Sequence, residues 1–250
     1  MSRIILSAAS RVGCVRTNNE DMVLAYDRLI RSDAYQTEIH TENVDRFVAA
    51  VADGMGGHLA GEVASEVALA NLQFFINDLP LGLTTQDFNE AMVGWLRSVN
   101  HIIESKGCAD RSMSDMGTTL VGMLYYGGKY YWVNCGDSRL YRLRDGKLTQ
   151  LSTDHSLNNL TGQAKHSNVI TNCIGGGCKN SYFDMYEFTA DIHEADVYLL
   201  CSDGLNDMVC DVDIERMLVE NRSANRLCEA AIRAGGFDNV SACVLEMAVE

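Results

Sequence analysis

Apolar runs separated by polar turns predict strands along much of this chain. Residues 47–52 are apolar at every position, which is typical of a strand covered on both faces of a sheet. Residues 27–45 are polar and weakly patterned, so we expect a strand and an exposed connection there. The other isolated runs predict strands at residues 4–10, 182–188, 197–201 and 242–247.

Two pairs of apolar, β-branched segments carry hairpin signals. Residues 118–126 and 129–135 are separated by Gly127-Gly128, and residues 139–144 and 147–151 by Asp145-Gly146. Two-residue turns of this kind connect antiparallel strands, because glycine and aspartate tolerate the positive φ angles that the turn requires. The sequence therefore predicts an antiparallel meander from residue 118 to residue 151.

Helical spacing of apolar residues predicts a covering layer. Val63, Val67, Ala70 and Phe74 recur at helical intervals, so we expect a helix over residues 61–77 with this face on the core. A break at residues 80–82 separates it from a longer amphipathic helix ending near Gly107. The core positions of this second helix are Phe88, Met92, Trp95, Leu96, Val99, Ile102 and Ile103. Two further helices are predicted at residues 213–220 and 224–234.

The order of these elements predicts the fold class. Strands and helices do not alternate regularly, which disfavours a doubly wound parallel sheet. The chain contains one proline and no low-complexity segment that would serve as a linker. We therefore expect one α+β domain over residues 1–250, a β-sandwich of two antiparallel sheets flanked by helices in four layers.

Net charge and the absence of long apolar runs limit which binding partners and which cellular compartment we expect. The formal net charge is -14, which disfavours nucleic acid and anionic membrane surfaces as partners, although a solvated acidic surface alone gives the same value. No stretch resembles a signal peptide or a membrane span, so a cytoplasmic location is expected. The nine cysteines include no Cys-x-x-Cys pair, and Cys135, Cys201 and Cys243 lie in apolar runs typical of a core.

The loop after the apolar run 47–52 is the first candidate for chemistry. It places Asp53 at a strand end, followed by Gly54, Met55, Gly56, Gly57 and His58. Glycines allow backbone groups to approach a small charged ligand closely, whereas the simpler interpretation is a flexible strand-to-helix turn. Arg16 stands four residues before the adjacent acids Glu20 and Asp21. A guanidinium suits phosphate oxygens and neighbouring carboxylates suit a hard cation, although a solvated turn would have the same composition.

Further acids follow or precede predicted strands. Asp137, Asp203 and Asp238 each adjoin one, and the apolar run before Asp203 repeats the arrangement before Asp53. An Asp-Gly pair alone is most often a turn, so only the whole set is informative. Carboxylates at strand ends, without cysteine or paired histidine, indicate an oxygen-ligand site for Mg²⁺ or Mn²⁺.

Taken together, these loops resemble the metal-dependent serine/threonine protein phosphatases of the protein phosphatase 2C type, particularly their short bacterial members. The resemblance spans residues 16–241. Seven motifs stand in the order that the family has, and such an ordered set is far more specific than any one of them. They are Arg16-x-x-x-Glu20-Asp21, Ala52-Asp53-Gly54-Met55-Gly56-Gly57-His58, Met116-Gly117-Thr118-Thr119, Gly136-Asp137-Ser138-Arg139, Ser152-Thr153-Asp154-His155-Ser156, Ser202-Asp203-Gly204 and Asp238-Asn239-Val240-Ser241.

The resemblance implies a role for each acid. Asp53 would bridge two tightly bound Mn²⁺ or Mg²⁺ ions, and Asp21 would orient their ligands from behind. Arg16 would bind the substrate phosphate. The remaining implied ligands are Glu20 and the Gly54 carbonyl for one ion, Asp203 and Asp238 for the other, and Asp137, Asp203 and Asp207 for a weaker third ion.

The same resemblance implies the reaction. A water bridging the two ions would attack phosphorus in phosphoserine or phosphothreonine of a protein, without a covalent enzyme intermediate. The expected partner is a phosphorylated protein that a Ser/Thr kinase modifies, and the enzyme is expected to be a monomer in signalling by dephosphorylation. The rival interpretations are a phosphoprotein-binding pseudophosphatase and a phosphoesterase acting on small phosphate esters. All four carboxylate ligands of the two ions are present, which disfavours the pseudophosphatase.

Two positions depart from the family pattern. Relatives with Asp-Gly-His in the opening loop offer that histidine as a general acid, but Met55 stands there in this chain, and His58 is three residues further on. The flap, around residues 155–170, has twelve residues between His155 and Asn168, fewer than bacterial relatives usually carry. The proton donor, substrate choice and third-ion site are therefore the features that the resemblance transfers least directly.

Overall fold

Two six-stranded antiparallel sheets stacked face to face form the centre of the computed structural model, which describes residues 3–56, 60–162 and 169–248. The first sheet has the order β11 (Lys147–Gln150), β10 (Arg139–Arg144), β14 (Val197–Cys201), β15 (Val240–Ala248), β1 (Arg3–Arg11), β4 (Ala34–His40). The second has the order β13 (Asp184–Glu187), β9 (Lys129–Cys135), β8 (Leu120–Tyr126), β5 (Arg46–Ala52), β2 (Met22–Ala25), β3 (Arg28–Ile30). The predicted sandwich class is confirmed.

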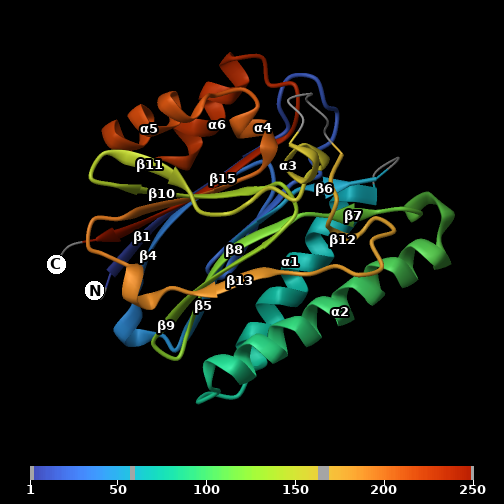
Figure 1. Ribbon diagram of the computed structural model, residues 1–250. Helices are drawn as coiled ribbons and strands as arrows, with labels where there is room; N and C mark the ends of the chain where they lie inside the picture. The colour runs from blue at the N-terminus through green and yellow to red at the C-terminus, as the bar shows by residue number, and fades with distance from the viewer. Residues whose placement is uncertain (1–2, 57–59, 163–168, 249–250) are drawn as a thin grey trace.

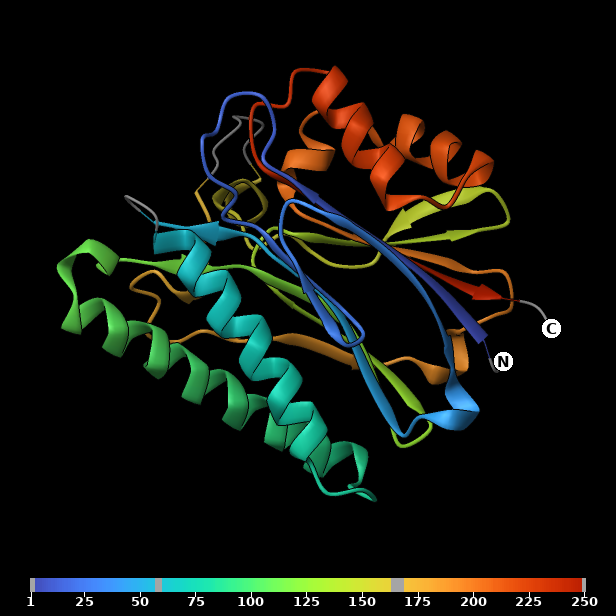
Figure 2. The same ribbon diagram turned by 180° about the vertical axis from the view of Figure 1, so that it is seen from behind.

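Helices cover both outer faces of the sandwich (Figure 1). α1 (Ala60–Asp78) and α2 (Thr85–Ala109) pack on the second sheet, and α5 (Asp211–Glu220) and α6 (Ala224–Arg233) pack on the first. Seen from behind, the two helix pairs lie on opposite sides of the stacked sheets (Figure 2). The shorter elements are α3 (Leu157–Thr161), α4 (Asp203–Asn206) and the 3-10 helices at Thr41–Asn43, Arg111–Met113 and Thr189–Asp191.

Three apolar clusters hold the layers together, one between the sheets and one under each helix pair. β5 is buried at every position from Phe47 to Ala52, as its uniform apolar run predicts. Cys135, Cys201 and Cys243 are fully buried, which confirms them as core residues. Within the described residues, no helix is long and apolar enough to cross a membrane.

The predicted meander is wrong, although both hairpins form. β8 and β9 pair across Gly127-Gly128 in the second sheet, whereas β10 and β11 pair across Asp145-Gly146 in the first. All four turn residues have positive φ, which is the conformation that the glycine-rich turns predict. The chain crosses from one sheet to the other between Cys135 and Arg139, so Asp137 lies where the two sheets meet.

The core-facing side of α1 is also different from the prediction. Phe74 is 73% exposed, and Val63 and Val67 are only partly buried. The buried face consists mainly of small residues, namely Ala60, Gly61, Ala64, Ser65, Ala68, Leu69, Leu72 and Ile76. Small side chains let the helix lie close to the sheet, and a search for bulky apolar residues misses such a face.

A third, three-stranded sheet was not predicted. β6 (Gly54–Met55) and β12 (Ile174–Gly175) pair with opposite edges of β7 (Gly117–Thr118). Thr118 Oγ1 and the Thr119 amide both donate hydrogen bonds to the Asp53 carbonyl, over 2.9 Å each. This small sheet therefore holds the backbone of the Asp53 loop at one end of the sandwich.

One stability prediction concerns Asp196, which is 1% exposed and precedes β14 at the end remote from Asp203. Its carboxylate accepts hydrogen bonds from Arg144 Nε (2.7 Å) and Nη2 (2.6 Å). The His193 amide also donates to it, over 2.9 Å. Burial alone would raise the pKa of Asp196, but these contacts lower it below its usual value of 3.8.

Asp196→Asn should therefore cost about 3 kcal/mol in unfolding free energy at pH 7, because it leaves Arg144 without its charge partner. A carboxyl with a lowered pKa stabilises the fold above its unfolded pKa and loses this contribution as the pH falls through the folded value. Urea unfolding of both proteins from pH 7 to pH 3 should show the difference shrinking below about pH 4. Asp213→Asn, in the exposed pair with Arg216, is the control and should cost less than about 1 kcal/mol. Equal effects of the two variants would contradict the prediction.

Candidate metal centre

Strand ends from both sheets gather the predicted acids at one end of the sandwich. In the second sheet Met22 pairs with Ala52, so Asp21 and Asp53 lie side by side where β2 begins and β5 ends. In the first sheet Cys201 pairs with Ala242, which brings the end of β14, before Asp203, to the start of β15, after Asp238. The register of two long-range strand pairs therefore brings these four acids together.

Glycines allow the closest approaches in this region. A Cβ on Gly204 would lie 1.9 Å from the Asn239 carbonyl oxygen, so α4 and the start of β15 touch through their backbones. A Cβ on Gly61 would lie 2.8 Å from the Glu20 carboxylate, which packs against the first turn of α1. A Cβ on Gly54 would lie 2.6 Å from the Glu20 carbonyl oxygen. Glu20 and the Gly54 loop are thus neighbours, as their predicted role at one ion requires.

The carboxyl groups affect one another strongly. Burial raises the pKa of Asp53 well above its usual value, and the carboxylates of Asp21 and Asp203 raise it further. Burial is also the main cause that raises the pKa of Asp21 to about 7, of Asp137 to about 7 and of Asp203 to about 6. Desolvated carboxylates this close together repel one another, and positive charge would be needed to offset that repulsion.

Asp21 lies deepest in the cluster and is 1% exposed. Its Oδ2 accepts a hydrogen bond of 2.7 Å from Ser202 Oγ. Its Oδ1 is buried and has no hydrogen-bond partner among the described residues. An unpartnered buried carboxylate oxygen among other acids suits a site that a cation and its water shell complete.

Arg16 is exposed at the edge of the cluster. Its Nη2 donates to Asp238 Oδ2 over 2.7 Å, so the predicted phosphate ligand is paired with a predicted metal ligand. The Asp238 contact raises the pKa of Arg16, with smaller contributions from Glu20 and Asp53. Asp207 is exposed and follows α4, and its charge raises the pKa values of both Asp203 and Asp137.

All the predicted ligand atoms are oxygens, and none is a sulfur or an imidazole nitrogen. Such a set suits a hard divalent cation such as Mg²⁺ or Mn²⁺. Within residues 3–56, 60–162 and 169–248, no three acid, histidine or cysteine side chains converge as a ready-made ligand set. One oxygen of the Asp238 carboxylate is engaged by Arg16. Gly57 and His58 of the opening loop, and residues 163–168 of the flap, lie outside the described residues.

Three residues that hold the acids in place were not assigned a role from the sequence. Asn239 Oδ1 accepts from the Glu20 amide (2.8 Å), while Asn239 Nδ2 donates to the carbonyls of Val12 (2.9 Å) and Asn18 (2.8 Å). Thr119 Oγ1 accepts from the Asp53 amide over 3.0 Å. Together with Ser202, these side chains are buried, and their presence in the family motifs was the available signal.

Comparison with known proteins agrees with this geometry. The family model for protein phosphatase 2C matches residues 25–236. The chain is 35% identical to the serine/threonine protein phosphatase PstP of Mycobacterium tuberculosis, over 99% of this chain and 46% of that protein. It is 31% identical to the serine/threonine phosphatase stp of Listeria welshimeri, over 80% of this chain and 84% of that protein. It thus spans about half the length of PstP.

The fold comparison leads to the same family. The crystal structure of the PstP catalytic domain in complex with two manganese ions superposes with a TM-score of 0.77 at 33% identity, covering 99% of this chain and 100% of that one. The structure of the S. agalactiae serine/threonine phosphatase superposes with a TM-score of 0.82 at 26% identity, covering 98% of this chain and 99% of that one. Shared fold, ordered motifs and clustered acids show that this chain belongs to the protein phosphatase 2C family.

Proposed function

We propose that this chain is one catalytic domain that hydrolyses phosphoserine and phosphothreonine in proteins with Mn²⁺ or Mg²⁺. The observation that carries the proposal is the cluster of desolvated carboxyls around Asp53, with Arg16 at its exposed edge. The names of the relatives support a protein substrate, and the manganese complex of PstP supports the metal. A Ser/Thr kinase would supply the substrate, and we propose a monomeric cytoplasmic enzyme.

Each residue has a distinct part in this proposal. Glu20, Asp53 and the Gly54 carbonyl would hold one ion, and Asp53, Asp203 and Asp238 the other. When bound, the ions lower the pKa of water and stabilise negative charge on the phosphoryl group. The charges of Asp21, Asp203, Asp137 and Asp238 all act on Asp53, which supports a shared role for its carboxylate.

The exposed guanidinium of Arg16 would orient the substrate. Arg16 presents a planar fork that matches two phosphate oxygens, and its contact with Asp238 holds it at the edge of the carboxyl cluster, where it would bind the substrate phosphate. Met55 has no titratable group, so position 55 supplies no proton to the leaving oxygen. Asp21 is buried beside Asp53 and accepts a hydrogen bond from Ser202, which supports an orienting role.

Phosphate release from a phosphothreonine peptide, with and without manganese, tests the proposal. Release that needs manganese and stops with a chelator is the expected result. Release from small phosphate esters but not from peptides would instead indicate the small-ester phosphoesterase. Binding of phosphopeptide without release would indicate the pseudophosphatase.

Arg16→Ala separates phosphate binding from metal binding. We expect KM for the phosphopeptide to rise roughly 10- to 100-fold with a fall in turnover, because charge-assisted hydrogen bonds contribute about 1.5–3 kcal/mol. Calorimetric titration should still show two tight manganese ions, since Arg16 is not a ligand. Loss of tight manganese binding would make Arg16 a structural residue instead. Arg216→Ala, in an exposed Arg-Asp pair on α5, is the matched control and should change neither measurement.

A further inference from the structure

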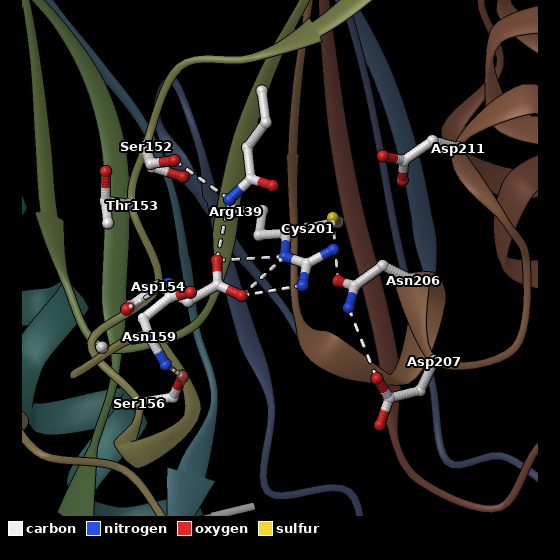
Figure 3. A network of polar contacts seen from close by, with 12 residues as sticks. Arg139, Ser152, Thr153, Asp154, Ser156, Asn159, Cys201, Asn206, Asp207 and Asp211 are labelled. Carbon is white, nitrogen blue, oxygen red and sulfur yellow. Dashed lines mark hydrogen bonds and ion pairs between the residues drawn. The ribbon is translucent and has the colours of Figure 1, made fainter. Parts of the chain in front are cut away.

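The loop that carries Asp137 is held along its length by residues 152–155. Asn134 Nδ2 donates to the Thr153 carbonyl (3.1 Å), and the Leu140 amide donates to Ser152 Oγ (2.9 Å). Arg139 binds Asp154 through Nε, 3.0 Å from each carboxylate oxygen, and through Nη2 at 2.7 Å (Figure 3). The residues on both sides of Asp137 are therefore fixed by one neighbouring segment.

His155 makes the contact closest to Asp137, on the Gly136 side. The His155 amide donates to the Gly136 carbonyl over 2.9 Å. The Gly136 amide donates in return to the His155 ring at Nδ1, over 3.1 Å. On its other side Gly136 packs closely against Thr119, since its φ is +124° and an added Cβ would lie 2.6 Å from that side chain.

The surroundings of the imidazole ring determine which nitrogen carries the proton. His155 is 6% exposed, and its Nδ1 lies 2.8 Å from Asn172 Nδ2 as well as facing the Gly136 amide. The Asn172 amide cannot be turned, since Nδ2 also donates to the Tyr182 carbonyl (2.8 Å) and Oδ1 accepts from the Tyr182 amide (3.2 Å). Nδ1 is thus an acceptor, and Nε2 donates to Asp184 Oδ2 over 3.0 Å.

His155 is also the point at which the flap joins the body of the protein. Its carbonyl accepts from the Thr171 amide over 2.8 Å, next to the bridge between Ser156 and Ile170. The Leu157 amide donates to the Val169 carbonyl over 2.9 Å, so the two ends of the flap run together. The two ends of the flap are therefore hydrogen-bonded to each other at and beside residue 155.

We infer that His155 is a positioning residue, which fixes the Gly136 amide and so directs the Asp137 carboxylate, and which couples the flap to that carboxylate. The inference rests on the proposed function for its effect on catalysis, and on the contacts above for its effect on the loop. In the contacts described above, His155 reaches the backbone of Gly136 rather than the Asp137 carboxylate. Its ring is oriented by Asp184 and Asn172 in the way that hydrogen-bonded neighbours orient ligating groups.

Two substitutions of His155 separate its two nitrogens. In His155→Asn the side-chain oxygen takes the place of Nδ1 and keeps an acceptor for Gly136. In His155→Gln the amide nitrogen takes the place of Nε2, which keeps a donor for Asp184 and removes the acceptor. Both variants introduce a side-chain amide, so they differ mainly in whether the Gly136 amide keeps its acceptor.

Amide hydrogen exchange of the metal-free protein tests the loop itself. Exchange at Gly136 should be at least about tenfold faster in His155→Gln than in wild type, and close to wild type in His155→Asn, because exchange requires the hydrogen bond to open. Asp196→Asn is the control for a general loss of stability, since it lies at the opposite end of β14. Equal protection of Gly136 in wild type and His155→Gln would overturn the inference.

A double-mutant cycle tests the coupling to Asp137. His155→Gln should lower kcat on the phosphothreonine peptide roughly 10- to 100-fold, as loss of a supporting contact does, and His155→Asn should recover most of it. Asp137→Ala should itself lose most activity, and adding His155→Gln should lower it no further. Multiplying effects would mean that His155 acts independently of Asp137, against the inference. If wild type releases no phosphate, the proposed function fails, and Gly136 exchange still decides the positioning role.

Discussion

Asp53→Asn is expected to abolish phosphate release while leaving the metal-free protein at least as stable as wild type. The carboxylate of Asp53 lies among those of Asp21, Asp203, Asp137 and Asp238, which disfavour its charged form. A neutral amide of the same shape removes this repulsion but cannot bridge two cations. We expect turnover to fall by more than about 100-fold, the upper range for residues that only support a metal ligand.

Phosphate release by wild type and Asp53→Asn tests the first half of this prediction, and thermal unfolding of both proteins, with and without manganese, tests the second. Ligand binding to the folded state stabilises it by about 2.7 kcal/mol at a concentration 100 times the Kd. Manganese should therefore raise the Tm of wild type clearly and that of the variant much less. Near wild-type turnover in the variant would remove Asp53 from the catalytic site.

Gly204→Ala is expected to damage both the fold and the site. The new Cβ would lie 1.9 Å from the Asn239 carbonyl oxygen and 3.0 Å from its carbon, which are backbone atoms that no rotamer change can move. α4 must then move away from β15, at a cost of about 1–3 kcal/mol or more. Asp203 precedes Gly204 and Asp238 precedes Asn239, so the same movement separates two predicted ligands of one ion.

Gly94→Ala is the matched control for this change. Gly94 also lies in a helix, but a Cβ there meets no atom within 4 Å. Alanine at an open helix position should stabilise the protein by up to about 1 kcal/mol. Urea unfolding should therefore show a lower stability for Gly204→Ala and a higher one for Gly94→Ala. Turnover should be lost only in Gly204→Ala. Full activity of Gly204→Ala would show that the spacing of Asp203 and Asp238 is not critical.

Local pattern was sufficient for most elements of this fold. The uniform apolar run before Asp53 predicted a strand buried on both faces, and β5 is buried from Phe47 to Ala52. Gly127-Gly128 and Asp145-Gly146 predicted hairpins because their backbone angles are a property of the residues themselves. The same pattern could not tell that the two hairpins join different sheets, since strand partners are chosen by contacts distant in sequence.

The face of α1 was mispredicted for a related reason. Helical periodicity finds bulky apolar residues such as Val63, Val67 and Phe74, but a close helix-to-sheet contact favours alanine, glycine and serine. Gly61 shows the need directly, because a side chain there would meet the Glu20 carboxylate. Hydrophobic size and closeness of packing are different properties, and only the second was decisive here.

By itself, the sequence determined the sandwich class, the strand-end acids and, through its ordered motifs, the family. Tertiary structure alone decided that Arg16 pairs with Asp238, that one oxygen of Asp21 lacks a partner among the described residues, and that His155 holds the Asp137 loop. The physical reason is range. Backbone preferences and apolar periodicity act over a few residues, whereas desolvation and mutual repulsion of carboxyls arise only when strands from both sheets end at the same place.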